Sequence, residues 1–104
     1  MSRGPDAATS LERALLAAAD AAGCPAILVT SDWTRWASAT FTGARHSLTL
    51  TAQPSPRLDQ WLVGLSEAEF ALRNYLVADL VVTRMCRDGD LVTVTIEALT
   101  VEER

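Results

Sequence analysis

Two segments of the chain repeat their hydrophobic residues at the spacing of an α-helix. In the first, leucines and alanines form one stripe from Leu11 to Ala22. In the second, hydrophobic residues recur at positions i, i+3, i+4 and i+7 from Leu58 to Leu65. Residues at these intervals share one face of a helix. The pattern therefore predicts two amphipathic helices, over residues 10–22 and 56–65.

Residues at the expected ends support both helices. Thr9 followed by Glu12 fits a capping box, in which each side chain accepts a hydrogen bond from the other residue's backbone amide. Gly23 suits the left-handed position that ends a helix. Ser55 is suited to cap the second helix, with Pro56 at its first position. Ahead of the first helix we expect a flexible arm over residues 1–8, followed by a single domain over residues 9–104.

Between the two helices the pattern changes to that of strands. Residues 26–29 form a short hydrophobic run, and residues 30–32 predict a kink or bulge. In residues 33–41 and 46–52, mainly hydrophobic residues then alternate with residues that are mainly Thr or Ser, as expected for the two faces of a strand. We therefore expect a β-hairpin with one solvent-exposed face.

The turn of this hairpin is predicted at Gly43 and Ala44. A type II′ turn takes glycine at its first central position, because that position needs a positive φ angle. A turn here would place Phe41 opposite His46 on the neighbouring strand.

The last third of the chain contains the strongest hairpin pattern. Residues 75–86 and 91–99 are rich in β-branched residues and surround Asp88-Gly89, a pair that suits a tight turn. A turn at this pair would place Cys86 opposite Leu91. One face of the hairpin would then contain Val77, Val81, Met85, Val92, Val94, Ile96 and Ala98, and the other Leu76, Ala78, Leu80, Val82, Leu91, Leu99 and Val101.

A second interpretation of residues 67–83 is a helix, since Leu72, Leu76 and Leu80 recur at intervals of four. Val81, Val82 and Thr83 favour the strand, because β-branched side chains lose rotamer freedom in a helix. With the strand, the element order is α-β-β-α-β-β. The predicted fold class is α+β, an antiparallel sheet of about four main strands with both helices on one face.

Charge and composition exclude several classes of protein. The chain of 104 residues has a net charge of −4, and its nine basic residues are scattered arginines. A nucleic-acid-binding protein needs a basic stripe that displaces counterions, so we expect no nucleic-acid partner. No run approaches the roughly 18 hydrophobic residues of a membrane span, so we expect no membrane insertion.

The cysteines bear on the cellular compartment. Cys24 and Cys86 form no Cys-x-x-Cys pair and are expected to be reduced and buried. The segment Ala22-Gly23-Cys24 is like the end of a lipoprotein signal, but Asp20 interrupts the hydrophobic region before it. We therefore expect a cytoplasmic protein.

His46 and Asp79 are the weak candidates for catalytic residues. His46 is the only histidine and follows Arg45, so it could act as a general base or bind an anion with that arginine. It could equally be a capping residue at the rim of the hydrophobic face. Asp79 lies within the most hydrophobic strand, where a buried carboxylate would need Arg35, Arg45 or His46 as a partner. At a sheet margin it would simply reach water.

Other chemistry has no sequence support. One histidine and two distant cysteines do not make a metal site, and no phosphate-binding glycine loop or nucleophile motif is present. We expect no metal and no cofactor. Among the tryptophans, Trp36 falls on the Thr/Ser side of its strand and is the one expected to be exposed as a binding anchor.

These patterns lead to two functional hypotheses. Two small helices cover one face of the sheet, which would leave the outer side of the last hairpin without cover. The first hypothesis is a non-enzymatic module that homodimerises through this side and binds another protein. The alternative is a small-ligand-binding protein or enzyme with a pocket near Arg45, His46 and Asp79. For the first hypothesis the interface residues are Leu76, Leu80, Val82, Leu91, Leu99 and Val101, with Trp36 and Arg45.

Overall fold

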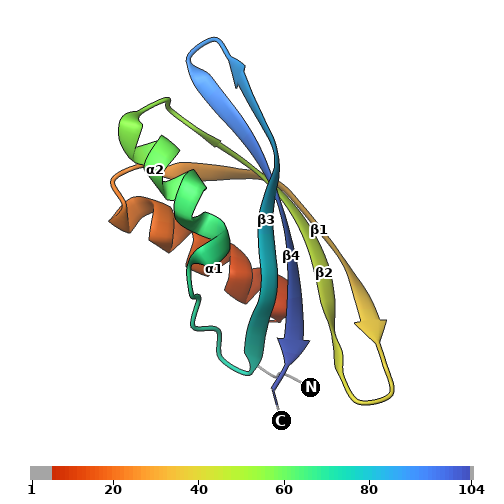
Figure 1. The fold of residues 1–104 in the computed structure, drawn as a ribbon. Helices are drawn as coiled ribbons and strands as arrows, with labels where there is room; N and C mark the ends of the chain where they lie inside the picture. The colour runs from red at the N-terminus through yellow and green to blue at the C-terminus, as the bar shows by residue number, and fades with distance from the viewer. Residues whose placement is uncertain (1–5, 104) are drawn as a thin grey trace.

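The computed structural model describes residues 6–103, which form two α-helices, a short 3₁₀-helix and one antiparallel sheet of four strands (Figure 1). This arrangement confirms the predicted α+β class and the order α-β-β-α-β-β. The elements are α1 (Ala7–Ala21), β1 (Ala26–Ala37), β2 (Thr42–Ala52), α2 (Pro56–Gly64), η1 (Leu65–Glu67), β3 (Tyr75–Asp88) and β4 (Leu91–Glu102).

The sheet consists of two hairpins placed side by side. The strand order is β1-β2-β4-β3, so β2 and β4 are the central strands and β1 and β3 are the edges. Each hairpin follows one helix, and both helices lie against the same face (Figure 1). We call the opposite face, which no described element covers, the open face.

The first helix begins earlier than the capping box predicts. Asp6 is the N-cap, and its Oδ1 accepts a hydrogen bond from the Thr9 backbone amide at 2.8 Å. Thr9 is therefore inside the helix, and Ala7 and Ala8 are buried helical residues rather than part of an arm. The remainder of the predicted arm, residues 1–5, lies outside the described residues.

The ends of both helices otherwise follow the prediction. Gly23 has a φ of 82°, and the amide of Cys24 donates to the carbonyl of Ala19, as in the motif that closes a helix with a left-handed glycine. Ser55 caps α2 by accepting a hydrogen bond from the Leu58 amide at 3.0 Å. Pro56 follows it at the first helical position.

The β1–β2 turn lies at residues 38–41 rather than at Gly43. Ser38 donates its backbone amide to the Phe41 carbonyl at 2.7 Å, and its hydroxyl accepts from the Phe41 amide at 3.1 Å. Ala37 therefore pairs with Thr42, and His46 pairs with Trp33 instead of Phe41. The predicted register was wrong because Gly43 is not a turn residue. It lies within β2, where the absence of a side chain allows close contact with β4.

The β3–β4 turn is also displaced, here by one residue. Gly89, with a φ of 62°, and Asp90 form the turn, so Asp88 rather than Cys86 pairs with Leu91. This displacement alone would keep every side chain on its predicted face, because it moves the pairing by two residues.

Two bulges in β3 change the faces. The pairing with β4 shifts between Val77 and Asp79 and again between Val82 and Arg84. An extra residue in one strand moves the following side chains to the other face. Leu80 and Val82 therefore lie on the helix side, where Leu80 is only 4% exposed. Their prediction as outer-face residues was wrong.

The core lies between the helices and the covered face of the sheet. Leu11, Leu15, Leu58 and Leu65 from the helical segments are at most 1% exposed. Burial of a side chain of this size contributes about 1.5–3 kcal/mol, so these contacts fix the helices on the sheet. The sheet contributes Leu48, Leu50, Leu80, Val92, Val94, Ile96 and Ala98 to the same cluster.

Residues 75–83 are part of β3, which confirms the strand over the rival helix. The tip of the β3–β4 hairpin extends past α2, and every residue from 83 to 91 is exposed (Figure 1). No helix within residues 6–103 is long and hydrophobic enough to cross a membrane.

Candidate interaction surface on the open face

One end of the open face is hydrophobic. Strand pairing places Trp36 of β1, Gly43 of β2, Val101 of β4 and Leu76 of β3 in one row across the sheet. Leu99 lies in the next row and Val81 in the row after it. We call the five side chains Trp36, Leu76, Val81, Leu99 and Val101 the open-face cluster.

Gly43 allows the strands of this row to come close together. A Cβ atom at Gly43 would overlap the Thr100 carbonyl oxygen and lie 3.0 Å from Cε2 of Trp36. The Trp36 ring therefore rests against the bare backbone of Gly43. Its Nε1 is buried and has no hydrogen-bond partner among the described residues. Trp36 is thus partly buried, and Trp33, at 47% exposure, is the more exposed tryptophan.

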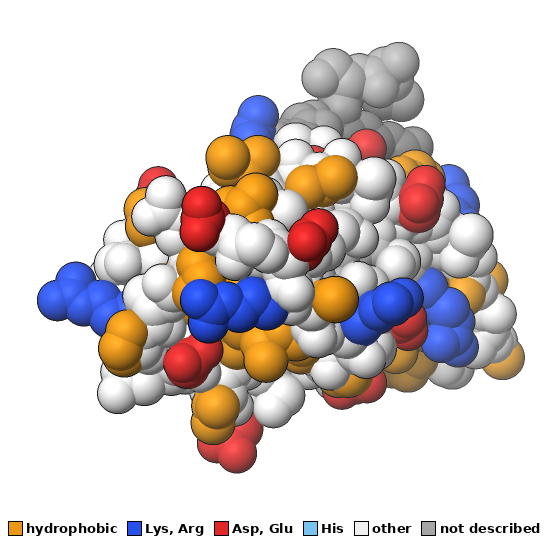
Figure 2. Space-filling view, turned by 90° about the horizontal axis from the view of Figure 1, so that it is seen from above, with side chains coloured by type: hydrophobic (Ala, Val, Ile, Leu, Met, Phe, Trp, Pro, Cys, Tyr) orange, Lys and Arg blue, Asp and Glu red, His pale blue; other side chains and the backbone are white. Residues whose placement is uncertain are grey.

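The cluster remains accessible in the single chain. Leu76 is 56% exposed and Val81 is 37% exposed, whereas Leu99, Val101 and Trp36 are half-buried by their neighbours. Leu76 adjoins Val101, and Val81 lies two rows away, beyond Asp79. Exposed hydrophobic side chains gathered in one region are characteristic of binding sites. At the other end of the face, Ile27 is 70% exposed and Leu91 is 45% exposed. In the view from above in Figure 2, hydrophobic side chains are interspersed with charged ones.

Charged side chains of both signs surround Leu99. Arg45 on β2 and Asp79 on β3 both pair with Leu99, so they lie on either side of it in one row. Both are exposed on the open face. Asp79 therefore reaches water at the sheet margin, in agreement with the simpler of its two interpretations. Glu97 lies in the next row along β4, where it pairs with Ser47 and Val81.

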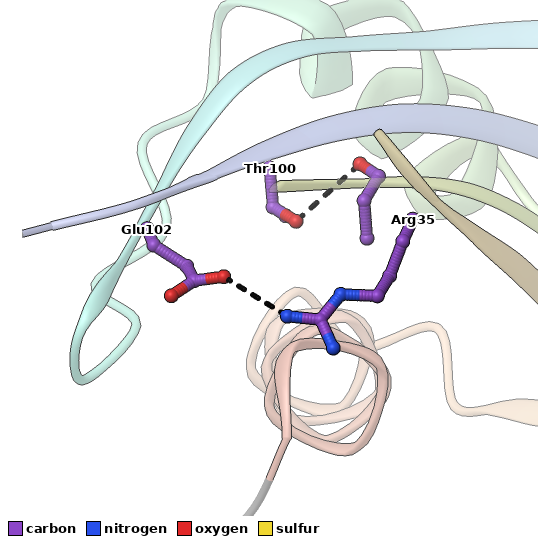
Figure 3. A network of polar contacts seen from close by, with 4 residues as sticks. Arg35, Thr100 and Glu102 are labelled. Carbon is purple, nitrogen blue, oxygen red and sulfur yellow. Dashed lines mark hydrogen bonds and ion pairs between the residues drawn. The ribbon is translucent and has the colours of Figure 1, made fainter. Parts of the chain in front are cut away.

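An ion pair borders this end of the sheet. Arg35 Nη2 lies 3.8 Å from Glu102 Oε2, and both side chains are well exposed (Figure 3). Exposed pairs of this kind contribute little to stability, on the order of 0–1 kcal/mol. Arg35 is therefore engaged with Glu102 and is not the partner of Asp79.

His46 belongs to the covered face and is 3% exposed. Its Nε2 lies 2.9 Å from Thr100 Oγ1, and Thr100 in turn donates its hydroxyl to the Ala44 carbonyl. The Thr100 oxygen then accepts from Nε2–H, which leaves Nδ1 unprotonated and without a partner among the described residues. Burial lowers the pKa of His46 below its usual value, and the carboxylates of Glu12 and Asp6 partly oppose this effect.

The three residues of the alternative hypothesis do not converge on a pocket. Arg45 and His46 are consecutive in a strand, so their side chains point to opposite faces. A shallow hollow of about 240 Å³ is lined by Arg45 and His46 together with Asp32 and Glu97, but Asp79 is not part of it. Cavities of about 400 and 650 Å³ lie at the other end of the molecule, near Cys24 and Met85 respectively.

Leu91 lies apart from the open-face cluster. It is 45% exposed at the tip of the β3–β4 hairpin, next to the turn. Cys86 is exposed on the same hairpin, whereas Cys24 is buried, and both are free thiols. The prediction that both cysteines are buried was therefore wrong for Cys86.

Sequence patterns identified most of the cluster but not Val81. An uninterrupted alternation in β3 assigns Val81 to the covered face, and the bulge at Thr83 turns it outward. No group of three or more acidic, histidine or cysteine side chains within residues 6–103 is arranged to hold a metal ion.

Comparisons with known proteins found no match to this chain. No family model matches the chain, and neither a curated protein nor a solved structure matches it.

Proposed function

We propose that the chain is a non-enzymatic interaction module that binds protein and forms a homodimer through the open face of its sheet. The observation that carries this proposal is the open-face cluster, whose side chains come from β1, β3 and β4 at one end of that face. The outer side of the β3–β4 hairpin supplies four of its five side chains. Leu91 and the hairpin tip lie outside this contact.

The composition of the surface supports a protein partner. The cluster combines one tryptophan, on the edge strand β1, with four aliphatic side chains, and Arg45, Asp79 and Glu97 lie beside them. Aromatic side chains and arginine are enriched in binding sites between proteins.

The size of the face is also suitable. Four strands about 4.8 Å apart and about ten residues long, at about 3.4 Å per residue, give a projected area of about 650 Å². A standard interface buries about 800 Å² on each partner, so one face of this sheet approaches that size before side-chain relief is included.

The compartment is part of the same proposal. Both cysteines are free, and one of them is exposed on the β3–β4 hairpin. A reducing environment keeps such thiols unpaired, so we place the protein in the cytoplasm.

The proposal predicts a dimer that one substitution at the centre of the cluster dissociates. Light scattering at micromolar concentration should give twice the 11.2 kDa mass of the chain. Leu99→Arg places a charge in the contact and should raise the dissociation constant more than about 30-fold, as loss of an interface hot spot does.

Val63→Arg is the matched control, because Val63 is 84% exposed on α2, away from the open face. This variant should remain dimeric, and far-UV circular dichroism should show that both variants are folded. A wild-type protein that is strictly monomeric at these concentrations would contradict the proposal.

A further inference from the structure

We propose that the two copies pack their open faces around a twofold axis that runs along β4 through Leu99, so that Arg45 of each copy contacts Asp79 of the other. The arrangement rests on the proposed homodimer and specifies which residues meet in it.

The positions of Arg45 and Asp79 determine this arrangement. Both residues pair with Leu99, one from β2 and the other from β3, so they lie on opposite sides of β4 at the same height. Neighbouring strands are about 4.8 Å apart, which places each charge at about this distance from the axis. A twofold axis along β4 exchanges the two sides in the facing copy. Arg45 then lies over Asp79 twice in the dimer.

The hydrophobic side chains fit the same axis. Leu99 and Val101 are both on β4 and meet their own counterparts. Leu76 lies on the β3 side of Val101 and Gly43 on the β2 side, so Leu76 of one copy faces Gly43 of the other. The Trp36 ring rests against the backbone of Gly43, so the leucine meets a hydrophobic side chain at this position. Two sheets related in this way keep their strands nearly aligned, which is a common geometry for packed sheets.

An axis across the strands at the same place would be much less favourable. It would place Arg45 against Arg45 and Asp79 against Asp79. Like charges that face one another in an interface oppose binding strongly. The charges around Leu99 thus favour the axis along β4 over the axis across the strands.

The selected arrangement has one unfavourable contact. Glu97 is also on β4, two residues from Leu99, so the axis brings it close to Glu97 of the other copy. Its side chain is exposed and can turn aside, which limits the repulsion. Glu97→Gln should remove this repulsion and lower the dissociation constant about 2- to 5-fold, as expected for a partly solvated charge contact.

The test uses charge reversal in two separate variants of the full chain. Arg45→Glu places two acidic pairs in the dimer, and Asp79→Arg places two basic pairs in it. Each variant alone should dissociate, with a dissociation constant raised at least about 100-fold. When the two are mixed, the introduced glutamate of one variant faces the introduced arginine of the other, and the remaining contact joins the native Arg45 to the native Asp79. A heterodimer should therefore form, and native mass spectrometry distinguishes it from either homodimer by mass.

The controls are Arg13→Glu and Glu67→Arg, which make the same kinds of charge change at exposed positions on the helix side. Both should remain dimeric as single variants. Recovery of a heterodimer on mixing, together with recovery of a homodimer in the double variant R45E/D79R, is the expected result.

Other outcomes separate the two proposals. A monomeric wild-type protein overturns the proposed function. A dimeric wild type whose charge variants remain dimeric, or whose two variants stay monomeric when mixed, overturns the arrangement alone. A Glu97→Gln variant that dimerises no more tightly than wild type counts against an axis along β4.

Discussion

Gly43→Ala tests whether the sheet depends on the close contact between β2 and β4. The added Cβ would overlap the Thr100 carbonyl oxygen and lie 3.0 Å from both the Thr100 carbonyl carbon and Cε2 of Trp36. The Trp36 ring can move away, but Thr100 is on a central strand that is paired on both sides. The backbone of β4 therefore cannot yield without loss of pairing to β2 or β3.

The size of the destabilisation follows from overpacking at Gly43 and from the loss of a hydrogen bond between strands. Overpacking of a dense site costs about 1–3 kcal/mol, and loss of one hydrogen bond between strands adds about 1 kcal/mol. We expect Gly43→Ala to lower the free energy of unfolding by about 3 kcal/mol. Urea unfolding at one fixed protein concentration, followed by tryptophan fluorescence and circular dichroism, should show a midpoint lower by about 2 M for an m-value of about 1.5 kcal/mol/M.

Gly64→Ala is the control for the loss of a glycine. Gly64 is the last residue of α2, has a φ of −86°, and a Cβ there would have no neighbour within 4 Å. Alanine should raise the free energy of unfolding by about 0.5–1 kcal/mol, because it restricts the unfolded chain. A Gly43→Ala variant within about 0.5 kcal/mol of wild type would refute the reasoning, since that is the usual range of harmless surface substitutions.

Two further predictions concern α1 and the residue beneath it. Asp6→Ala removes the observed cap and should lower the free energy of unfolding by about 1 kcal/mol, measured by thermal or urea unfolding. Thr9→Ala retains the backbone amide that Asp6 binds and should lower it much less. A larger loss for Thr9→Ala than for Asp6→Ala would instead support the capping box predicted from the sequence. The Thr9 amide also lowers the pKa of Asp6 from its usual 3.8, so the contribution of the cap is present above that pH and is lost as the pH falls below it. His46 has its pKa lowered from 6.5, so below pH 6.5 the unfolded state binds more protons than the native state. Wild-type stability should therefore fall as the pH decreases through 6.5, by at most about 1.4 kcal/mol per pH unit, and His46→Gln should lose this dependence. Equal slopes between pH 7.5 and 5.5 in the two proteins would contradict the burial of a neutral imidazole.

The order of elements was predictable because each has a clear local pattern. The hydrophobic stripe of α2 and its Ser55-Pro56 start are sufficient to predict that helix. Asp6 was missed as a cap because Thr9 and Glu12 form a well-known capping pair only three residues later. Which of two polar residues caps a helix depends on how the helix packs, and Ala7 and Ala8 are buried against the sheet.

The first hairpin register was not predictable from local patterns. Gly43 looks like a turn glycine in the sequence. The residue that excludes a side chain there is Thr100, and no local pattern around Gly43 indicates that contact. Contacts between strands far apart in the chain decide the use of such a glycine. The turn instead forms at Ser38, whose hydroxyl and amide both bond to Phe41.

The faces of β3 were unpredictable for a related reason. From Leu76 to Val82 hydrophobic side chains occur at both odd and even positions, so the sequence contains no alternation that would reveal a bulge. Alternation in β4 and in β2, by contrast, fixed the sides of Leu48, Ile96 and Leu99 correctly. A strand that is hydrophobic on both sides can accept an extra residue without exposing more of its surface.

The bulges also determine what kind of surface the open face presents. With Leu80 and Val82 turned inward, the outward hydrophobic side chains of β3 near Leu99 are reduced to Leu76 and Val81, on either side of Asp79. A larger hydrophobic face could meet a second copy in many registers, because hydrophobic attraction has no direction. In the dimer that we propose, the charges beside Leu99 restrict this choice, because an axis across the strands places like charges together and an axis along β4 places opposite charges together. The two bulges of β3 therefore determine which side chains would meet in the proposed dimer.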